Sequence, residues 1–124
     1  MILTIDSRDG IHNQDQVFSD ADEQMAIYWF SKLNGKQHTL LNLDRNDGWQ
    51  LMVGGSQLCY IVTLTNESES LTFRNTSGNE GIVVEVCAGG QYGNFPEIFC
   101  ANFEKAKNII VLFFQGKEMQ ETWV

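Results

Sequence analysis

The chain has 124 residues, 43 % of them hydrophobic and 11 % aromatic, which suits one globular domain, residues 1–124. Sixteen Asp and Glu residues outnumber eight Lys and Arg residues, giving a formal net charge of −8. This charge disfavours nucleic acids, whose phosphates would be repelled, and favours a basic protein as a partner. No apolar run approaches the length of a membrane span, and the first residues lack a secretion signal. We therefore expect a cytoplasmic protein.

The three cysteines, Cys59, Cys87 and Cys100, lie far apart in the sequence and form no CxxC pair. In a chain without a secretion signal this pattern predicts reduced, mostly buried cysteines rather than a disulfide framework. It also argues against structural zinc, which needs about four closely spaced Cys or His ligands.

The N-terminal part of the chain predicts one strand and one helix. Residues 1–5 form a short apolar strand, and a polar, irregular segment follows. Residues 18–35 then form a helix that Ser19 or Asp20 can cap and that Gly35 ends. Its apolar face consists of residues at three- and four-residue steps, namely Ala21, Met25, Tyr28, Trp29 and Leu33.

From residue 38 onward the apolar pattern alternates with a period of two. Strand-like segments cover residues 38–44, 49–55, 58–65, 70–74 and 82–88. Leu58, Tyr60, Val62 and Leu64 share one face of the third of these segments. Turn sequences such as Asp47-Gly48 separate the strands, and this pair favours a type I′ hairpin turn. Short strands joined by tight turns predict an antiparallel meander, because parallel strands need long crossover connections.

The C-terminal part predicts a loop, a second helix and a short closing segment. The loop covers residues 89–99 and holds the only proline, Pro96. Asn102 caps the helix and Gly116 ends it; the inner face is formed by Ala106, Ile109, Ile110 and Phe113. The fold class is therefore α+β: a mostly antiparallel sheet of about five to seven short strands, with two main helices packed on it.

The segment DRNDGWQLMVGG, residues 44–55, is the stretch that most resembles a ligand loop. As an EF-hand starting at Asp44 its spacing is one residue short, and Gly55 stands where a glutamate is needed. No glycine pair precedes a lysine as in a P-loop, and GGQYG at 89–93 does not lead into a helix as a dinucleotide loop would. We interpret the segment as a hairpin in which Asp47-Gly48 turns the chain and Gly54-Gly55 end the strand.

Catalytic and cofactor signatures are not apparent. His12 and His38 belong to no recognisable catalytic motif, so we expect a non-enzymatic protein without a metal or cofactor. One alternative is a small α+β ligand-binding or enzyme domain, with a pocket between sheet and helices lined by Trp29, Tyr60 and His38. A second alternative is a structural subunit that joins a larger assembly through a sheet edge.

The order of these features supports a family resemblance. A helix is followed by the hairpin DGWQLMVGG…LCYIVTLT, a Gly-rich loop with FPEIF, the helix FEKAKNIIVLFFQGK and a terminal ETWV. This order, over residues 17–124, resembles the Imm1 family of immunity proteins of bacterial polymorphic-toxin and contact-dependent growth inhibition systems. The resemblance implies a non-catalytic protein that binds a cognate toxin domain, often a nuclease or deaminase, and blocks its active site. The matching residues, such as Gly54, Pro96, Phe113 and Gly116, are residues of the fold, and toxin contacts vary with the toxin.

The candidate toxin-binding residues follow from the charge pattern. Acids in and beside the strand-rich middle would bind Arg and Lys on the toxin through charge-assisted hydrogen bonds. Trp49, next to a turn, is a candidate interface anchor, because tryptophan contributes disproportionately to binding energy. Glu85 alternates out of an apolar strand and would point to solvent or pair with Arg74. The full set is Asp44, Asp47, Trp49, Glu67, Glu69, Glu80, Glu85 and Glu97.

Overall fold

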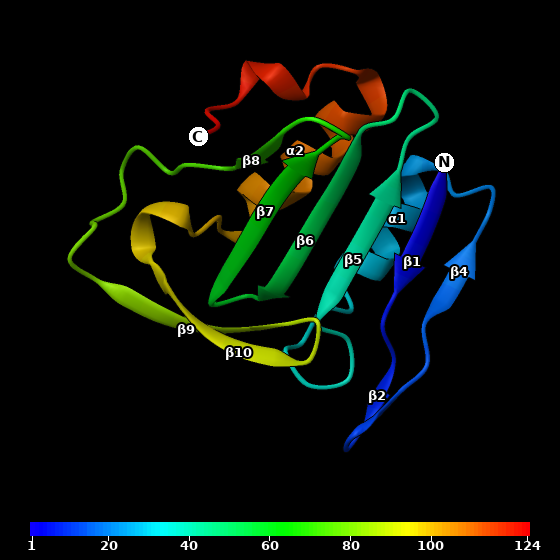
Figure 1. The fold of residues 1–124 in the computed structure, drawn as a ribbon, viewed down its shortest axis with the longest axis horizontal. Coiled ribbons are helices and arrows are strands. Elements are labelled where there is room, and N and C mark those ends of the chain that lie inside the picture. Colours follow the sequence, from blue (N-terminus) through cyan, green and yellow to red (C-terminus); the bar gives the residue numbers. More distant parts are fainter.

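A six-stranded antiparallel sheet with two helices on one face forms the centre of the molecule (Figure 1). The computed structural model describes all 124 residues. The strand order is β4-β1-β5-β6-β7-β8. The bounds are β1 (Ile2–Ile5), β4 (Gln16–Phe18), β5 (Leu40–Asp44), β6 (Gln50–Ser56), β7 (Cys59–Thr65), β8 (Ser70–Thr72), α1 (Glu23–Phe30) and α2 (Phe103–Gln115). The predicted α+β class is confirmed, and β5 to β8 form the expected meander.

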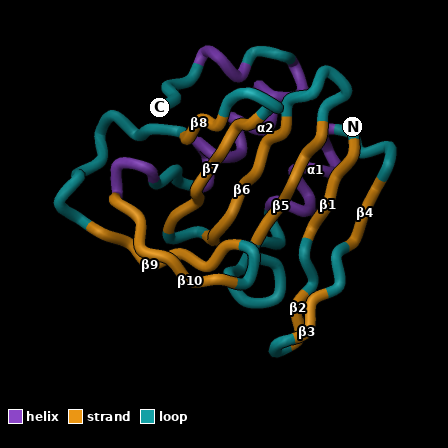
Figure 2. Tube along the Cα trace, viewed as in Figure 1, coloured by secondary structure: helices purple, strands orange, loops and turns teal.

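Two small hairpins lie outside this sheet (Figure 2). One joins β2 (Arg8–Asp9) to β3 (His12–Asn13), and the other joins β9 (Val83–Ala88) to β10 (Gln91–Pro96). The second hairpin shows that residues 89–99 are not the predicted loop, because they contain β10 and the short 3₁₀ helix η1 (Glu97–Phe99). Gly89 and Gly90 both have positive φ, which is the requirement of a two-residue type I′ turn.

Helix α2 begins and ends as predicted, with Asn102 accepting from the Lys105 N–H and Gly116 in the left-handed region. Helix α1 is shorter than predicted, but most of its predicted apolar face meets the core: Ala21 and Leu33 are buried, and Met25 and Trp29 pack against the core. Asp22 caps it in place of Ser19 or Asp20, and it ends at Phe30. Ala26 and Phe30 are fully buried, whereas Tyr28 is exposed. The cause is that residues 25–30 are apolar on every side, so their spacing does not select the face that meets the sheet.

The core fills the space between the sheet and the helices. Tyr60, Val62 and Leu64 face the helices as their alternation predicted, but Leu58 lies in the β6–β7 turn and is 89 % exposed. The largest fully buried side chains come from four strands and both helices: Leu3, Ile5, Phe30, Leu41, Leu43, Leu51, Val53, Tyr60, Leu64, Ile109, Ile110 and Phe113. Each such side chain contributes about 1.5–3 kcal/mol through burial, so this layer supplies most of the stability.

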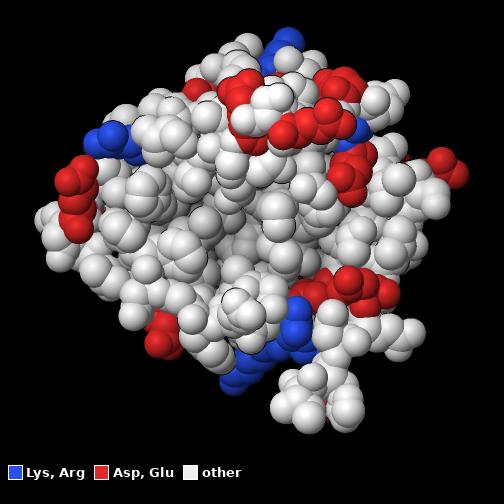
Figure 3. Space-filling view, in the orientation of Figure 1, with Lys and Arg blue, Asp and Glu red and all other residues white.

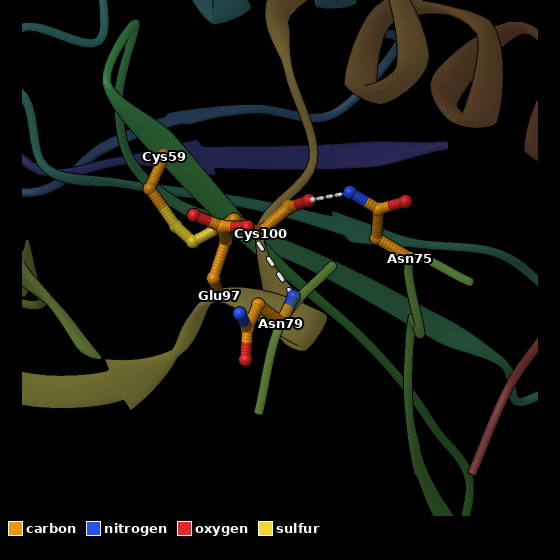
Figure 4. Close-up of a disulfide and its surroundings, with 5 residues drawn as sticks. All are labelled: Cys59, Asn75, Asn79, Glu97 and Cys100. Atoms are coloured by element: carbon orange, nitrogen blue, oxygen red, sulfur yellow. Dashed lines mark hydrogen bonds between the residues drawn. A yellow bond between two sulfur atoms is a disulfide. The ribbon is translucent and has the colours of Figure 1, made fainter. Parts of the chain in front are cut away.

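Two of the three cysteines form a disulfide, which corrects the prediction that all are reduced. Tyr60 and Ala101 form an isolated antiparallel bridge, with backbone N–H to oxygen distances of 3.0 and 2.9 Å. This bridge places Cys59 beside Cys100, with 5.0 Å between their Cα atoms, and the two are bonded (Figure 4). Cys87 is free and buried. The pair is 41 residues apart in sequence, so no local spacing could indicate it.

Candidate functional site

The β5–β6 turn is a three-residue hairpin loop, Asn46–Gly48. The Arg45 N–H donates to the Trp49 carbonyl (2.9 Å), and the Gly48 N–H donates to the Arg45 carbonyl (3.2 Å). Only Gly48 has a positive φ, so the hairpin prediction is correct but the type I′ turn is wrong. The Asp47 carboxylate accepts from the Trp49 N–H (3.1 Å) and from Arg45 Nε (3.0 Å). The hydrogen bond from Arg45 holds the pKa of Asp47 below its usual value.

The side chain of Arg45 points into the protein rather than toward solvent. Its Nη1 lies 2.5 Å from Glu118 Oε1 and 2.7 Å from the Phe113 carbonyl oxygen. Its guanidinium carbon lies 4.3 Å from the centre of the Phe113 ring. Burial lowers the pKa of Arg45, but the hydrogen bonds that it donates to Glu118 and Asp47 outweigh this effect and leave that pKa raised. These contacts fix the turn to the C-terminal end of α2.

Four of the predicted acids gather at this end of the sheet, and we call them the acidic end: Asp44, Asp47, Glu67 and Glu69. The β5–β6 and β7–β8 turns are neighbours here, because Asp47 and Glu67 line the same surface hollow of about 380 Å³. The Asn66 side chain accepts from the N–H groups of Ser68 and Glu69, both at 2.8 Å, and so fixes the second turn. Figure 3 shows acidic side chains along this rim.

Three acids of the acidic end lack a cationic partner. Asp44, Glu67 and Glu69 take part in none of the five ion pairs of the protein. Asp44 accepts only from the amides of Asn42 (3.3 Å) and Gln50 (3.0 Å). The negative charge of this end is therefore not neutralised internally and is available to a partner.

The other predicted site residues lie elsewhere. Trp49 is half-buried at the edge of the core rather than exposed. Glu80 pairs with Arg74 (3.5 Å), and Glu97 accepts from the Asn79 N–H (3.3 Å; Figure 4). Glu85 is exposed on β9 and has no ion pair. The single acidic cluster expected from the sequence is thus divided between the acidic end and the region of the β9–β10 hairpin.

The face of the sheet opposite the helices, which we call the open face, is only partly covered. Thr4, Asn42, Met52 and Thr63 follow one another across β1, β5, β6 and β7 on this face. The β9–β10 hairpin packs against its lower part (Figure 1). A Cβ atom at Gly54 would lie 2.5 Å from the Ala88 Cβ. Gly54 and Gly55 lie inside β6, so they do not end the strand as predicted; they permit the hairpin to approach it.

Two adjoining hollows occupy the open face. The polar hollow has a volume of about 320 Å³ and is lined by Thr4, Asp6, Arg8, Asn13, Asp15, Leu40, Asn42, Met52 and Gly89. The apolar groove has a volume of about 260 Å³ and is lined by Leu40, Met52, Gly54, Ile61, Thr63, Ala88 and Phe95. Because they share Leu40 and Met52, they form one concavity. Figure 3 shows an uncharged hollow in the middle of this face, with acidic and basic side chains at its lower border.

A buried hydrogen-bond network borders this concavity. The Asp6 carboxylate accepts from the hydroxyl and N–H of Thr39, from the Leu40 N–H (3.0 Å) and from Arg8 Nε (2.6 Å). Burial raises the pKa of Asp6, but these hydrogen bonds outweigh it and leave the pKa below its usual value. The Thr39 hydroxyl in turn accepts from the Gly90 N–H (3.0 Å). The network therefore joins β1 and β5 to the β9–β10 turn.

The pocket of the ligand-binding alternative has no counterpart among the five principal hollows. Tyr60 and His38 are buried, Trp29 packs edge-on against His38, and none of the three lines such a hollow. Phe30 and Phe113 help to fill the space between sheet and helices. No group of three or more His, Cys, Asp or Glu side chains is arranged to hold a metal ion.

Comparison with protein-family models, curated proteins and solved structures finds no match for this chain. The resemblance to the Imm1 family therefore stays a prediction. None of the helices combines the length and the apolar character needed to cross a membrane.

Proposed function

We propose that this protein is an immunity protein that binds a basic toxin domain, of nuclease or deaminase type, and occludes its active site. The observation that carries the proposal is the acidic end, where Asp44, Glu67 and Glu69 have no cationic partner within the protein. A toxin that acts on nucleic acid must attract phosphate, so its active face is basic. Carboxylates can occupy the positions that phosphates would take.

The local structure supports a binding role, because the turns that carry these acids are held in place before any partner arrives. Arg45 anchors the β5–β6 turn to the Phe113 carbonyl of α2 and to Glu118 just beyond that helix, and Asn66 holds the β7–β8 turn. A preorganised surface loses less conformational entropy on binding than a flexible one. A net charge of −8 also accelerates encounter with a basic partner.

The test is binding to the product of the adjacent upstream gene. That protein, purified in an inactivated form, should be retained by this chain in a pull-down, and co-expression of this chain should relieve its toxicity. The wild-type protein and a variant with Glu67→Lys and Glu69→Lys would be compared, with Glu85→Lys and Glu104→Lys as the matched charge control. No retention, together with toxicity that co-expression leaves unchanged, would contradict the proposal.

A cytoplasmic location is part of this proposal and can be tested through the disulfide. Cytoplasmic thiols keep most cysteines reduced, so a Cys59–Cys100 disulfide is unusual in that compartment. Alkylation of thiols in intact cells, followed by mass spectrometry, measures the fraction oxidised. Complete oxidation in the producing cell would point to an oxidising compartment and to a toxin that is met there.

A further inference from the structure

We propose that the polar hollow on the open face receives an arginine side chain of the partner. The inference rests on the proposed function and specifies the partner chemistry at a second place, on the open face and toward the end of β1 and β5 that lies opposite the acidic end. The polar hollow is formed by side chains from β1, β3, β5 and β6, with Asp15 just before β4. It is therefore a feature of the assembled fold and not of one loop.

Asn42 supplies the first reason. Its Nδ2 donates to Asp44 Oδ2 (3.3 Å), which fixes the orientation of the amide, because the opposite orientation would place two oxygens together. Its Oδ1 is then buried and has no hydrogen-bond donor, the one such side-chain atom in the protein. Unpaired buried acceptors are rare in folded proteins. Asn42 lines the polar hollow, but its Oδ1 has almost no accessible surface, so a donor in the hollow would satisfy this atom only after the amide shifts toward it.

The charges around the hollow supply the second reason. Arg8 and Asp6 form an ion pair (2.6 Å) and so offset one another. Asp15 has no ion pair and accepts only from the Asn13 amide (2.9 Å), so its charge remains. Asp44, hydrogen-bonded to Asn42, adds a further negative charge nearby. The hollow therefore attracts a cation. An anion is disfavoured, because one drawn to Arg8 would also be repelled by Asp15 and by the unpaired oxygen of Asn42.

The shape of the concavity selects a guanidinium on an aliphatic stem. Five N–H donors in one plane can serve the Asn42 oxygen and the Asp15 carboxylate together, which the compact ammonium of lysine does less well. Leu40 and Met52 lie between the polar hollow and the apolar groove, where they can cover the methylene groups of the side chain. Ile61 and Phe95 in the apolar groove would then contact an apolar neighbour of that arginine.

The test uses ethylguanidinium chloride as a probe of the purified protein, followed by amide and side-chain NMR shifts. Saturable shifts at Thr4, Asn42 and Met52 are expected. Asp15→Asn should weaken binding about tenfold, as the loss of a charge-assisted hydrogen bond implies. Asn42→Leu should weaken it as well, whereas Glu85→Gln, an exposed acid on β9, should bind the probe like the wild type. Sodium phosphate and sodium chloride serve as anion and salt controls.

Shifts that match those in sodium chloride, or that Asp15→Asn leaves unchanged, would overturn the inference; so would phosphate shifting the same peaks. The probe contains no toxin, so this outcome is distinct from failure of the pull-down. If the protein retains the upstream gene product but does not bind ethylguanidinium, the proposed function is supported and the arginine site is contradicted.

Discussion

The two faces of the sheet are built from alternate residues of the same strands, yet they differ in nearly every property. The covered face carries large apolar side chains with no exposure, such as Leu43, Leu51 and Val62, and they meet α1 and α2. The open face carries Thr4, Asn42 and Thr63 and is closed only in part by the β9–β10 hairpin. The covered face determines the fold, and we propose that the open face contributes to binding a partner.

The largest expected effect lies on the covered face. Phe113→Ala leaves a cavity between α2 and the sheet and removes the ring beneath Arg45, so we expect a loss of about 3–5 kcal/mol in the free energy of unfolding. Thr63→Ala on the open face should cost less than about 1 kcal/mol. Urea denaturation measures both. Equal losses at the two positions would remove the distinction between the faces.

The disulfide comes next, because it secures the segment that partly closes the open face. Replacing both Cys59 and Cys100 by serine should lower the free energy of unfolding by about 2–4 kcal/mol, because the link restrains a 41-residue separation in the unfolded chain. A reducing agent should destabilise the wild type similarly. Cys87→Ala, which removes the free thiol, is the control and should respond to reductant as the wild type does. Wild-type stability that is indifferent to reductant would mean that the bond does not form.

A smaller effect concerns the network at the border of the open face. We expect Asp6→Asn to lower the free energy of unfolding by about 1–3 kcal/mol at pH 7, because Arg8 loses its charged partner. The pKa of Asp6 is lower in the folded protein than the ordinary 3.8, so its stabilisation is present above that pH and is lost as the pH falls through the folded value. The free energies of unfolding of the wild type and of Asp6→Asn, measured from denaturation curves, should therefore converge as the pH is lowered. A difference in free energy of unfolding between the two proteins that stays constant with pH would show that the charge of Asp6 does not contribute to stability.

Local signals explain what could be predicted from the sequence. Asn102 and Gly116 bound α2, and its apolar residues keep one consistent face. The alternation in residues 58–65 places Tyr60, Val62 and Leu64 correctly. Both features depend on residues within a few positions of one another, where backbone geometry alone fixes which side chains share a face.

Contacts between distant segments explain what could not be predicted. The Cys59–Cys100 bond depends on the Tyr60–Ala101 bridge. A glycine is needed at position 54 because Ala88, from a distant segment, packs closely against it. The acidic end was predicted residue by residue, but its separation from Glu85 and Glu97 follows from where the β9–β10 hairpin lies. The polar hollow could not be predicted from the sequence, because the residues that line it come from several segments.

The smallest effect on stability should accompany the largest effect on binding. Glu67→Lys with Glu69→Lys changes two exposed residues of the acidic end, and the free energy of unfolding should move by less than about 0.5 kcal/mol. The association rate with the upstream gene product, measured at several salt concentrations, tests the central claim most directly. We expect this variant to associate more slowly and with a weaker salt dependence than the wild type, while Glu85→Lys with Glu104→Lys has a clearly smaller effect. Equal effects of the two variants, or none from the first, would contradict a binding surface at the acidic end.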